Sequence, residues 1–265
     1  MVVGVPARSI SNVCIKIKHK LTTGGNDITD CSILTGGKMV FIDHNPAFLL
    51  ILNVDGSQKR KISLRTRNAL GVACIDQNTA AVTSLSDKLI QLVDVNTGKT
   101  VKSINTNRTC SGITSINGML VFVVIGEGLR KVNLKNEYIV EIVAFAADCW
   151  SRVTSFNDIL YYTDSTRSEV VCCDINGTIL WTLKDKSVLK TPRSITVDDY
   201  GNVFVLCADP FNVIVISPDG KKCRQLFSKA DRIENPRALH YDRQTRQLCV
   251  ANQKKSAFIC SVDYQ

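Results

Sequence analysis

The side chains best suited to nucleophilic or metal chemistry are three histidines and 11 cysteines in a chain of 265 residues. His19, His44 and His240 are far apart, and no Ser/His/Asp arrangement, GxSxG or HExxH motif accompanies them. The cysteines are scattered and none forms a CxxC pair, so the sequence supports neither a zinc site nor a disulfide framework. We therefore predict structural histidines, reduced thiols, no metal or cofactor, and no catalytic centre.

Arginines form the second group of candidates, because a guanidinium fork matches the geometry of phosphate and carboxylate groups. Five of them stand in equivalent short segments, each just before an apolar stretch: Arg67, Arg108, Arg152, Arg193 and Arg237. Trp150 and Phe211 are candidates for stacking on bases beside them. The alternative is that Arg193 and Arg237, each preceded by a proline, brace neighbouring loops, and that both aromatic rings are buried.

An internal repeat must position these arginines. A short apolar strand, a polar turn and a longer apolar strand recur along the chain. The first apolar position of each copy follows the previous one by 40 to 44 residues, at Cys31, Val72, Ile113, Val153, Ile195 and Leu239. That spacing is the length of a four-stranded propeller blade. The sequence therefore predicts an all-β, six-bladed β-propeller with the five arginines in loops on one rim of the disc.

Turn signals separate the strands within each copy. Asn176-Gly177 stands between two apolar runs, which predicts a hairpin with a type I′ turn, and Asp219-Gly220 occupies a matching place. The second strand of four copies ends in a similar polar residue, at Asp43, Asp164, Asp209 and Asn252. We expect each of these side chains to bond the backbone of its own turn rather than a metal ion.

The last copy is one strand short, because only three strands follow Leu239. The segment VCIKIKHKL, residues 13–21, precedes the first copy and supplies the missing outer strand. Side chains alternate along a strand, so Lys16, Lys18 and Lys20 share one face, as lysines do on protected edge strands. We predict an N-terminal extension over residues 1–12 and a propeller over residues 13–265 that is closed by its N-terminal strand.

Three copies carry a likeness to a known family. "TPRSITVDDYGNVFVLCADPFNVIVISPDGKK" and "NPRALHYDRQTRQLCVANQKKSAFICSVD" have a Pro-Arg pair before the inner strand, and "CWSRVTSFNDILYYTDSTRSEVVCCDINGTILW" is close although it lacks the proline. On these residues the chain resembles an NHL-repeat propeller and, more narrowly, the C-terminal propeller of tripartite-motif (TRIM) proteins. The resemblance implies a domain that selects protein or RNA partners for a ubiquitin ligase. Zinc-ligand cysteine pairs are missing, so we do not expect this chain to act as a RING ligase itself.

Three functions stay open from the sequence, and we place recruitment of a protein partner in a ubiquitin-linked pathway first. The second is binding of single-stranded RNA, which the net charge of +9 favours. Basic residues at 58–61 and 221–224 spread that charge around the perimeter and weaken the RNA hypothesis. The third is a metal-dependent hydrolase or lyase, disfavoured because Asp30 is the only carboxylate in the segments entering the inner strands.

Location follows from two further features of the sequence. No apolar run is long enough to cross a membrane, and the first residues lack the apolar core of a signal peptide. We therefore expect a soluble, cytoplasmic protein without a membrane partner. Nothing in the sequence specifies the partner or an oligomeric state.

Overall fold

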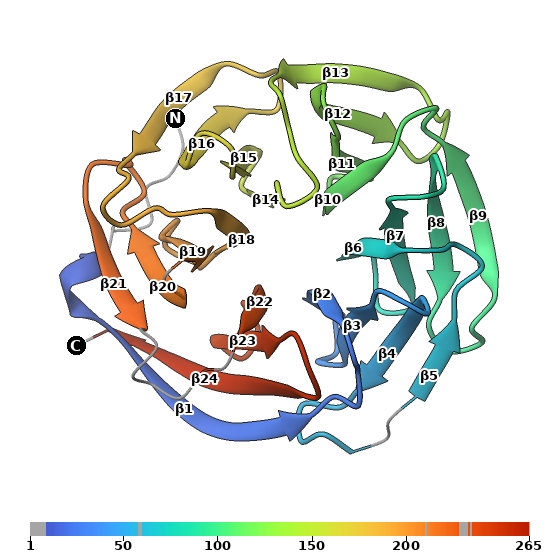
Figure 1. Ribbon diagram of the computed structural model, residues 1–265, viewed down its shortest axis with the longest axis horizontal. Helices are drawn as coiled ribbons and strands as arrows, with labels where there is room; N and C mark the ends of the chain where they lie inside the picture. The colour runs from blue at the N-terminus through green and yellow to red at the C-terminus, as the bar shows by residue number, and fades with distance from the viewer. Residues whose placement is uncertain (1–8, 58–59, 210, 228–232, 234, 265) are drawn as a thin grey trace.

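Short apolar segments bounded by turns fold into six four-stranded antiparallel sheets arranged as the blades of a ring (Figure 1). The structure, a computed structural model, describes residues 9–57, 60–209, 211–227, 233 and 235–264. Within these residues the only helix is a short 3₁₀ turn, η1 (Ile10–Asn12). The predicted all-β, six-bladed propeller is confirmed.

Within each blade, the first strand lies at the centre of the ring and the fourth strand lies at its rim (Figure 1). Blade 1 consists of β2 (Ile28–Ile33), β3 (Met39–Asp43), β4 (Phe48–Leu52) and β5 (Arg60–Ser63). Blade 2 consists of β6 (Ala69–Cys74), β7 (Thr79–Ser84), β8 (Leu89–Asp94) and β9 (Thr100–Asn105). Blade 3 consists of β10 (Cys110–Ile116), β11 (Met119–Val124), β12 (Gly128–Asn133) and β13 (Ile139–Ala144).

The second half of the ring repeats this order until its last strand. Blade 4 consists of β14 (Val153–Phe156), β15 (Ile159–Asp164), β16 (Glu169–Asp174) and β17 (Ile179–Lys184). Blade 5 consists of β18 (Pro192–Val197), β19 (Val203–Ala208), β20 (Phe211–Ile216) and β21 (Cys223–Phe227). Blade 6 consists of β22 (Pro236–Asp242), β23 (Gln247–Asn252), β24 (Ser256–Tyr264) and, as its outer strand, β1 (Val13–Thr22).

The hydrophobic core lies between neighbouring blades. Second strands such as β3 and β11 are buried along almost their whole length, whereas the outer strands β9 and β17 have alternating or mostly exposed side chains. Each blade packs face to face on both neighbours, so a second strand such as β11, with the sequence MLVFVV, reads as a continuous apolar run. Val40 and Ile42 of blade 1, for example, share one cluster with Val72 and Val82 of blade 2.

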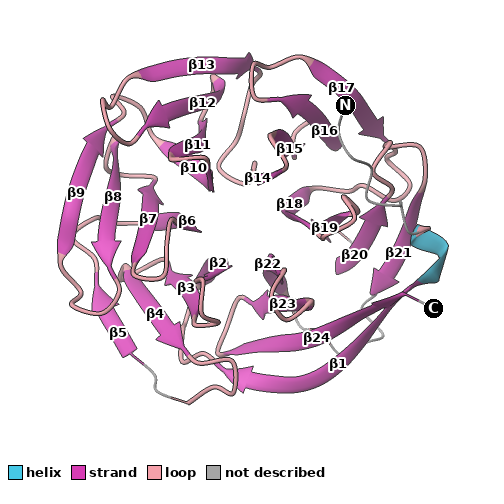
Figure 2. Ribbon diagram, turned by 180° about the vertical axis from the view of Figure 1, so that it is seen from behind, coloured by secondary structure: helices cyan, strands magenta, loops and turns pink. Residues whose placement is uncertain are grey.

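The N-terminal strand closes the ring. β1 pairs antiparallel with β24, from Val13 opposite Tyr264 to Thr22 opposite Ser256, with a bulge between Ile17 and His19. This confirms the predicted closure. The three lysines of β1 are exposed, but the prediction that they share one face was wrong: the bulge breaks the alternation, so Lys16, opposite Ser261, and Lys20, opposite Phe258, lie on different faces. Figure 2 shows η1 beside β21. Ile10 is buried in the core there, so residues 10–12 of the predicted extension pack on the propeller, and residues 1–8 lie outside the described part.

The turn at Asn176-Gly177 differs from the predicted type I′ hairpin. Gly177 has a φ of 92°, but Asn176 is not in the left-handed region, and the hairpin closes through Asp174 N–H donating to Thr178 O at 3.0 Å. The Asp174 carboxylate accepts the N–H groups of Asn176 and Thr178, which favours a longer loop with a bulge at the glycine. The prediction was wrong because it ignored this side chain.

The polar residues that end the second strands bond in two ways. Asp164 accepts the hydroxyl of Thr166 and the N–H of Arg167, within its own turn as predicted. Asp43 instead accepts the N–H groups of Asn26 and Asp27, in the loop that leads into the inner strand of its blade. Prediction of an own-turn bond was therefore wrong for Asp43, whose carboxylate reaches a neighbouring loop.

Candidate binding site on the interblade face

Interblade loops join the outer strand of one blade to the inner strand of the next. Because strands alternate in direction within a blade, these loops lie on one face of the disc, named here the interblade face. The loop of residues 145–152, between β13 and β14, runs from the rim toward the centre (Figure 1). Asp148 holds its shape by accepting the N–H groups of Trp150 at 2.9 Å and Ser151 at 2.8 Å.

Two arginines from the following blades meet at Trp150. The guanidinium carbon of Arg193 lies 4.3 Å from the centroid of the Trp150 ring, and that of Arg237 lies 5.1 Å from it. Both distances are within the range of cation–π attraction. We name Trp150, Arg193 and Arg237 the arginine–tryptophan cluster; it joins blades 4, 5 and 6.

Arg193 and Arg237 each lie in a β-bulge, which determines the direction of the side chain. In blade 5, Pro192 pairs with Cys207 and Ser194 with Leu206, which leaves Arg193 as the extra residue. The same shift leaves Arg237 unpaired between Pro236 and Ala238 in blade 6. An extra residue in one strand bends that strand locally and redirects its side chain, so the Pro-Arg pairs seen in the sequence mark bulges.

The guanidinium groups of the cluster have donors without acceptors. Nε of Arg193, and Nε and Nη1 of Arg237, are buried without a hydrogen-bond acceptor, and neither guanidinium donates a hydrogen bond to any described residue. Burial, and next the charge of Arg237, lowers the pKa of Arg193. The two groups therefore concentrate positive charge that the surrounding protein leaves without partners.

Nearby carboxylates are committed to other groups. Asp148 also accepts the hydroxyls of Ser151 and Ser165, and Asp27 accepts Nε2 of Gln253 at 2.9 Å. None of the ion pairs among the described residues includes Arg193 or Arg237. These acids reduce the local charge, but they do not satisfy the arginine donors.

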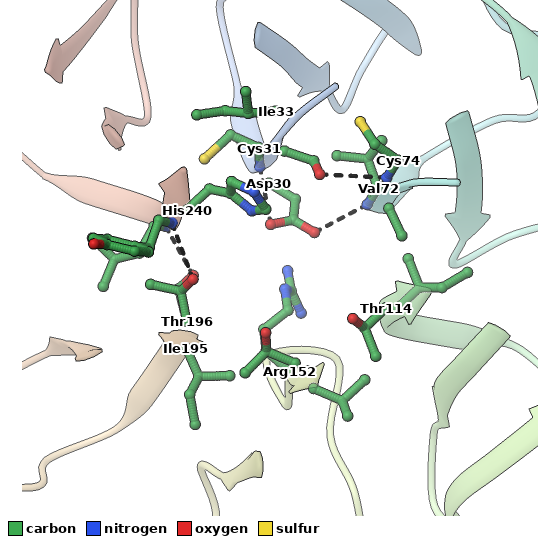
Figure 3. A pocket seen from close by; sticks show the side chains of 18 of the residues that line it. Asp30, Cys31, Ile33, Val72, Cys74, Thr114, Arg152, Ile195, Thr196 and His240 are labelled. Atoms are coloured by element: carbon green, nitrogen blue, oxygen red, sulfur yellow. Dashed lines mark hydrogen bonds between the residues drawn. The ribbon is translucent and has the colours of Figure 1, made fainter. Parts of the chain in front are cut away.

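Arg152 crosses the central channel beside this cluster. Its Nη1 donates to Cys149 O at 2.9 Å and its Nη2 reaches Thr29 O in blade 1 at 3.4 Å. The side chain is only 4% exposed, and its Nε is buried without an acceptor among the described residues. Figure 3 shows the Arg152 guanidinium in the channel, facing Asp30.

Asp30 is the buried acid on the opposite wall. Its carboxylate accepts the N–H groups of Cys31 at 2.9 Å and Val72 at 3.0 Å. Burial raises the pKa of Asp30 to about 6, although the Arg152 charge and both N–H groups oppose the shift. At the interblade face, the end of the channel thus contains the Arg152 guanidinium and the Asp30 carboxyl group. The two groups face each other but do not form an ion pair.

The channel itself is a polar cavity of about 210 Å³ lined by inner strands. Several lining hydroxyls tie one blade to the next: Ser194 Oγ accepts Leu239 N–H at 2.9 Å, and Thr196 Oγ1 accepts Tyr241 N–H at 3.0 Å. At the opposite end, Arg243 Nη2 donates to Val197 O at 3.2 Å. The cavity therefore has an arginine at each end.

The other predicted binding residues lie elsewhere. Arg67 and Arg108 are on the interblade face, as predicted, but Arg67 is exposed in the loop between blades 1 and 2, and Arg108 pairs with Glu127. Phe211 lines a small apolar pocket with Phe227 and nearby residues of blades 5 and 6. Of the predicted set, the structure brings together Trp150, Arg152, Arg193 and Arg237.

Sequence reasoning missed the opposite end of the channel. Arg243 and His240 line the cavity, and Arg243 also lies over the Phe156 ring at 4.8 Å. Only the segments before the inner strands were considered for binding, whereas Arg243 stands just after one. The sequence feature that could have identified this site is a basic residue, Arg243, directly after the inner strand that ends at Asp242.

Comparisons with known proteins show the fold. The sequence matches no protein-family model and no curated protein. Among solved structures, a structural-genomics protein of unknown function from Bacteroides thetaiotaomicron is similar with a TM-score of 0.70 and 11% identity, over 95% of this chain and 76% of that one. The class of protein is therefore the six-bladed β-propeller.

Two further structures have the same fold. A chain of a nidogen/laminin complex gives a TM-score of 0.68 at 13% identity, over 77% of this chain and 82% of that one. Virginiamycin B lyase from Staphylococcus aureus gives 0.65 at 13% identity, over 93% of this chain and 99% of that one. At such identities the likeness extends to the fold alone, and the NHL and TRIM resemblance stays a prediction.

Two other kinds of site are missing from the described residues. No group of three or more His, Cys, Asp and Glu side chains is placed to hold a metal ion in the described ranges. No helix within those ranges has the length and apolarity needed to span a bilayer.

Proposed function

We propose that this propeller is a non-enzymatic platform that recruits a protein partner through the arginine–tryptophan cluster. The observation that carries the proposal is a pair of half-buried guanidiniums on Trp150 with N–H groups that have no acceptor. A buried donor without an acceptor costs roughly 1–3 kcal/mol, so binding an acidic segment of a partner would relieve that cost. The partner's carboxylates or other oxyanions would supply the acceptors.

A protein partner fits this surface better than RNA does. The Trp150 ring is already in contact with two guanidiniums, which leaves less of it to stack on a base. Arg108 pairs with Glu127, and Arg67 is far along the ring, so the five arginines do not form one basic track for a phosphate backbone. The nidogen/laminin structure supports the use of this fold in a protein complex.

The finer proposal follows the TRIM resemblance. We propose that the partner is a substrate or adaptor in a ubiquitin-linked pathway and that the protein acts in the cytosol. The 11 cysteines are free, and most are buried, which suits a reducing compartment. Arg193 and Arg237 would form the binding surface, both in contact with the Trp150 ring, and Arg152 lies buried behind them in the channel.

The test compares partner capture by three purified proteins from RNase-treated cytosolic extract. The parent chain is compared with an Arg193→Gln/Arg237→Gln variant and with an Arg65→Gln/Lys88→Gln control, which loses the same charge from exposed positions away from the cluster. We expect a partner that the parent and the control retain and that the cluster variant loses. Titration of that purified partner should show at least about tenfold weaker binding to the cluster variant.

Two results would contradict the proposal. Equal binding to the cluster variant would remove the site. Saturable binding to a random single-stranded RNA pool, falling steeply with salt and lost in the cluster variant, would establish the RNA alternative in its place.

A further inference from the structure

We infer that the arginine–tryptophan cluster recognises a phosphomonoester carried by the partner segment, that is, a phosphorylated serine, threonine or tyrosine. This inference rests on the proposed function and names the chemistry of the group that is bound. Its evidence is the number, placement and charge of the guanidinium N–H groups of Arg193 and Arg237 that have no acceptor.

Charge is the first argument. Arg193 and Arg237 both contact the Trp150 ring, and burial first, then the charges of Arg237 and Arg152, lower the pKa of Arg193. A single carboxylate would neutralise one of these cations and leave the others repelling each other. A phosphomonoester carries about −1.5 to −2 at neutral pH, so one group offsets two guanidiniums.

Geometry is the second argument. The donors without acceptors belong to separate guanidiniums: Nε of Arg193, and Nε and Nη1 of Arg237. A carboxylate has two oxygens in one plane and matches a single fork, whereas a phosphate presents three oxygens in different directions. Both residues are half-buried as a whole, whereas these three nitrogens are buried, so a ligand between the arginines meets the nitrogens once the side chains rotate about their flexible stems.

The local acids make the third argument. Asp148 and Asp27 lie close enough to raise the pKa of Arg193 and Arg237, respectively, yet their oxygens accept other groups. They limit the excess charge of the free protein without filling the donors. A strongly charged ligand oxygen can therefore compete for the guanidiniums, whereas a neutral hydroxyl has little advantage over water.

The experiment measures fluorescence polarisation with degenerate peptide libraries that have a fixed central residue. The centres are phosphoserine, phosphothreonine and phosphotyrosine, each matched by the unmodified residue and by glutamate, and phenyl phosphate serves as a phosphomonoester without a peptide. We expect one phosphorylated library to bind at least about tenfold more tightly than its unmodified and glutamate counterparts. The Arg193→Gln/Arg237→Gln variant should lose about 100-fold, and the Arg65→Gln/Lys88→Gln control should bind like the parent.

A second variant separates fork geometry from charge. Arg193→Lys/Arg237→Lys keeps both charges but lacks the planar forks, and we expect affinity between those of the parent and the glutamine variant. Thermal melting of every variant confirms folding, and the lysine variant decides the question if the glutamine variant is unfolded.

The opposing results are distinct. Equal binding of phosphorylated and glutamate libraries would overturn the phosphate inference while leaving an acidic protein partner, and hence the proposed function, intact. Failure of every phosphorylated library to bind would also overturn it. Phenyl phosphate binding as tightly as the best peptide would overturn the peptide assignment in favour of a free phosphorylated molecule.

Discussion

Gly112, in the inner strand of blade 3, lies against the loop that leads into the inner strand of blade 4, and its lack of a side chain leaves room for Arg152. A Cβ at this residue would lie 2.6 Å from the Arg152 Cα and 3.0 Å from Ser151 O. Its φ is not in the left-handed region, so the requirement for glycine is one of space. The position of Arg152 therefore depends on Gly112, a residue that the sequence alone gave no reason to single out.

Gly112→Ala should destabilise the fold by about 3 kcal/mol, because the backbone atoms of Ser151 and Arg152 in the facing loop have no room to move aside. Denaturant unfolding measures the change. Gly118→Ala is the control: Gly118 has a φ of 73° but nothing within 4 Å of its added Cβ, so we expect a loss of about 1 kcal/mol. Equal losses in the two variants would contradict the close approach.

His240 supplies a pH-dependent term from inside the channel. Burial, and next the charge of Arg243, lowers its pKa to about 4, so between pH 6.5 and 4 the unfolded chain binds a proton that the folded chain does not. Stability is therefore lost as pH falls through this window, by at most about 3 kcal/mol and nearer 1–2 because the ring lines a polar cavity. Asp30, with its raised pKa, acts in the opposite direction between about pH 6 and 4.

His240→Gln should remove this loss. Relative to the parent protein, the variant should become more stable as pH falls from 7 to 4, since only the Asp30 gain then remains at this cavity. Urea unfolding of both proteins at several pH values measures the difference. His240 shares its cavity with Asp30, Arg152 and Arg243, and we expect it to be a neutral ring there. A stability difference that stays constant across that pH range would contradict this expectation.

At the scale of elements, most strand positions follow from apolar periodicity, and the details of turns and bulges do not. The six predicted inner-strand positions all fall in inner strands, because the apolar side chains that pack between the blades recur at the repeat length. The Asn176-Gly177 turn type was missed because Asp174 hydrogen-bonds its backbone. The bulges that expose Arg193 and Arg237 were missed because a Pro-Arg pair specifies no pairing register by itself.

Removing residues 1–22 should open blade 6 and lower the thermal midpoint by about 10 °C or more. β1 contributes the buried side chains of Val13 and Leu21, worth roughly 3–6 kcal/mol together, and covers the edge of β24. Calorimetry measures the midpoint, and light scattering should detect association through the exposed edge. A control chain lacking only residues 1–8 keeps β1, and equal midpoints for the two truncations would refute the closing role.

For the whole molecule, the repeat length predicted the architecture, but the binding site arises from long-range assembly. Trp150 and Arg237 are in blades 4 and 6, and they meet because the loop of residues 145–152 runs inward. No local pattern encodes that path. Arg67, Arg108 and Phe211 occupied equivalent or nearby positions in sequence and were grouped with the others for that reason, although the ring places them apart.

The pairing of β1 with β24 also sets an order on synthesis of the chain. Among the strands of the propeller, residues 13–22 are made first, yet their partners, residues 256–264, are made last. Blades 1 to 5 each contain four strands that are consecutive in the sequence and can form as they emerge, whereas blade 6 must wait. During translation the N-terminal strand therefore has no native partner, and the charges of its exposed lysines oppose pairing with the wrong strand.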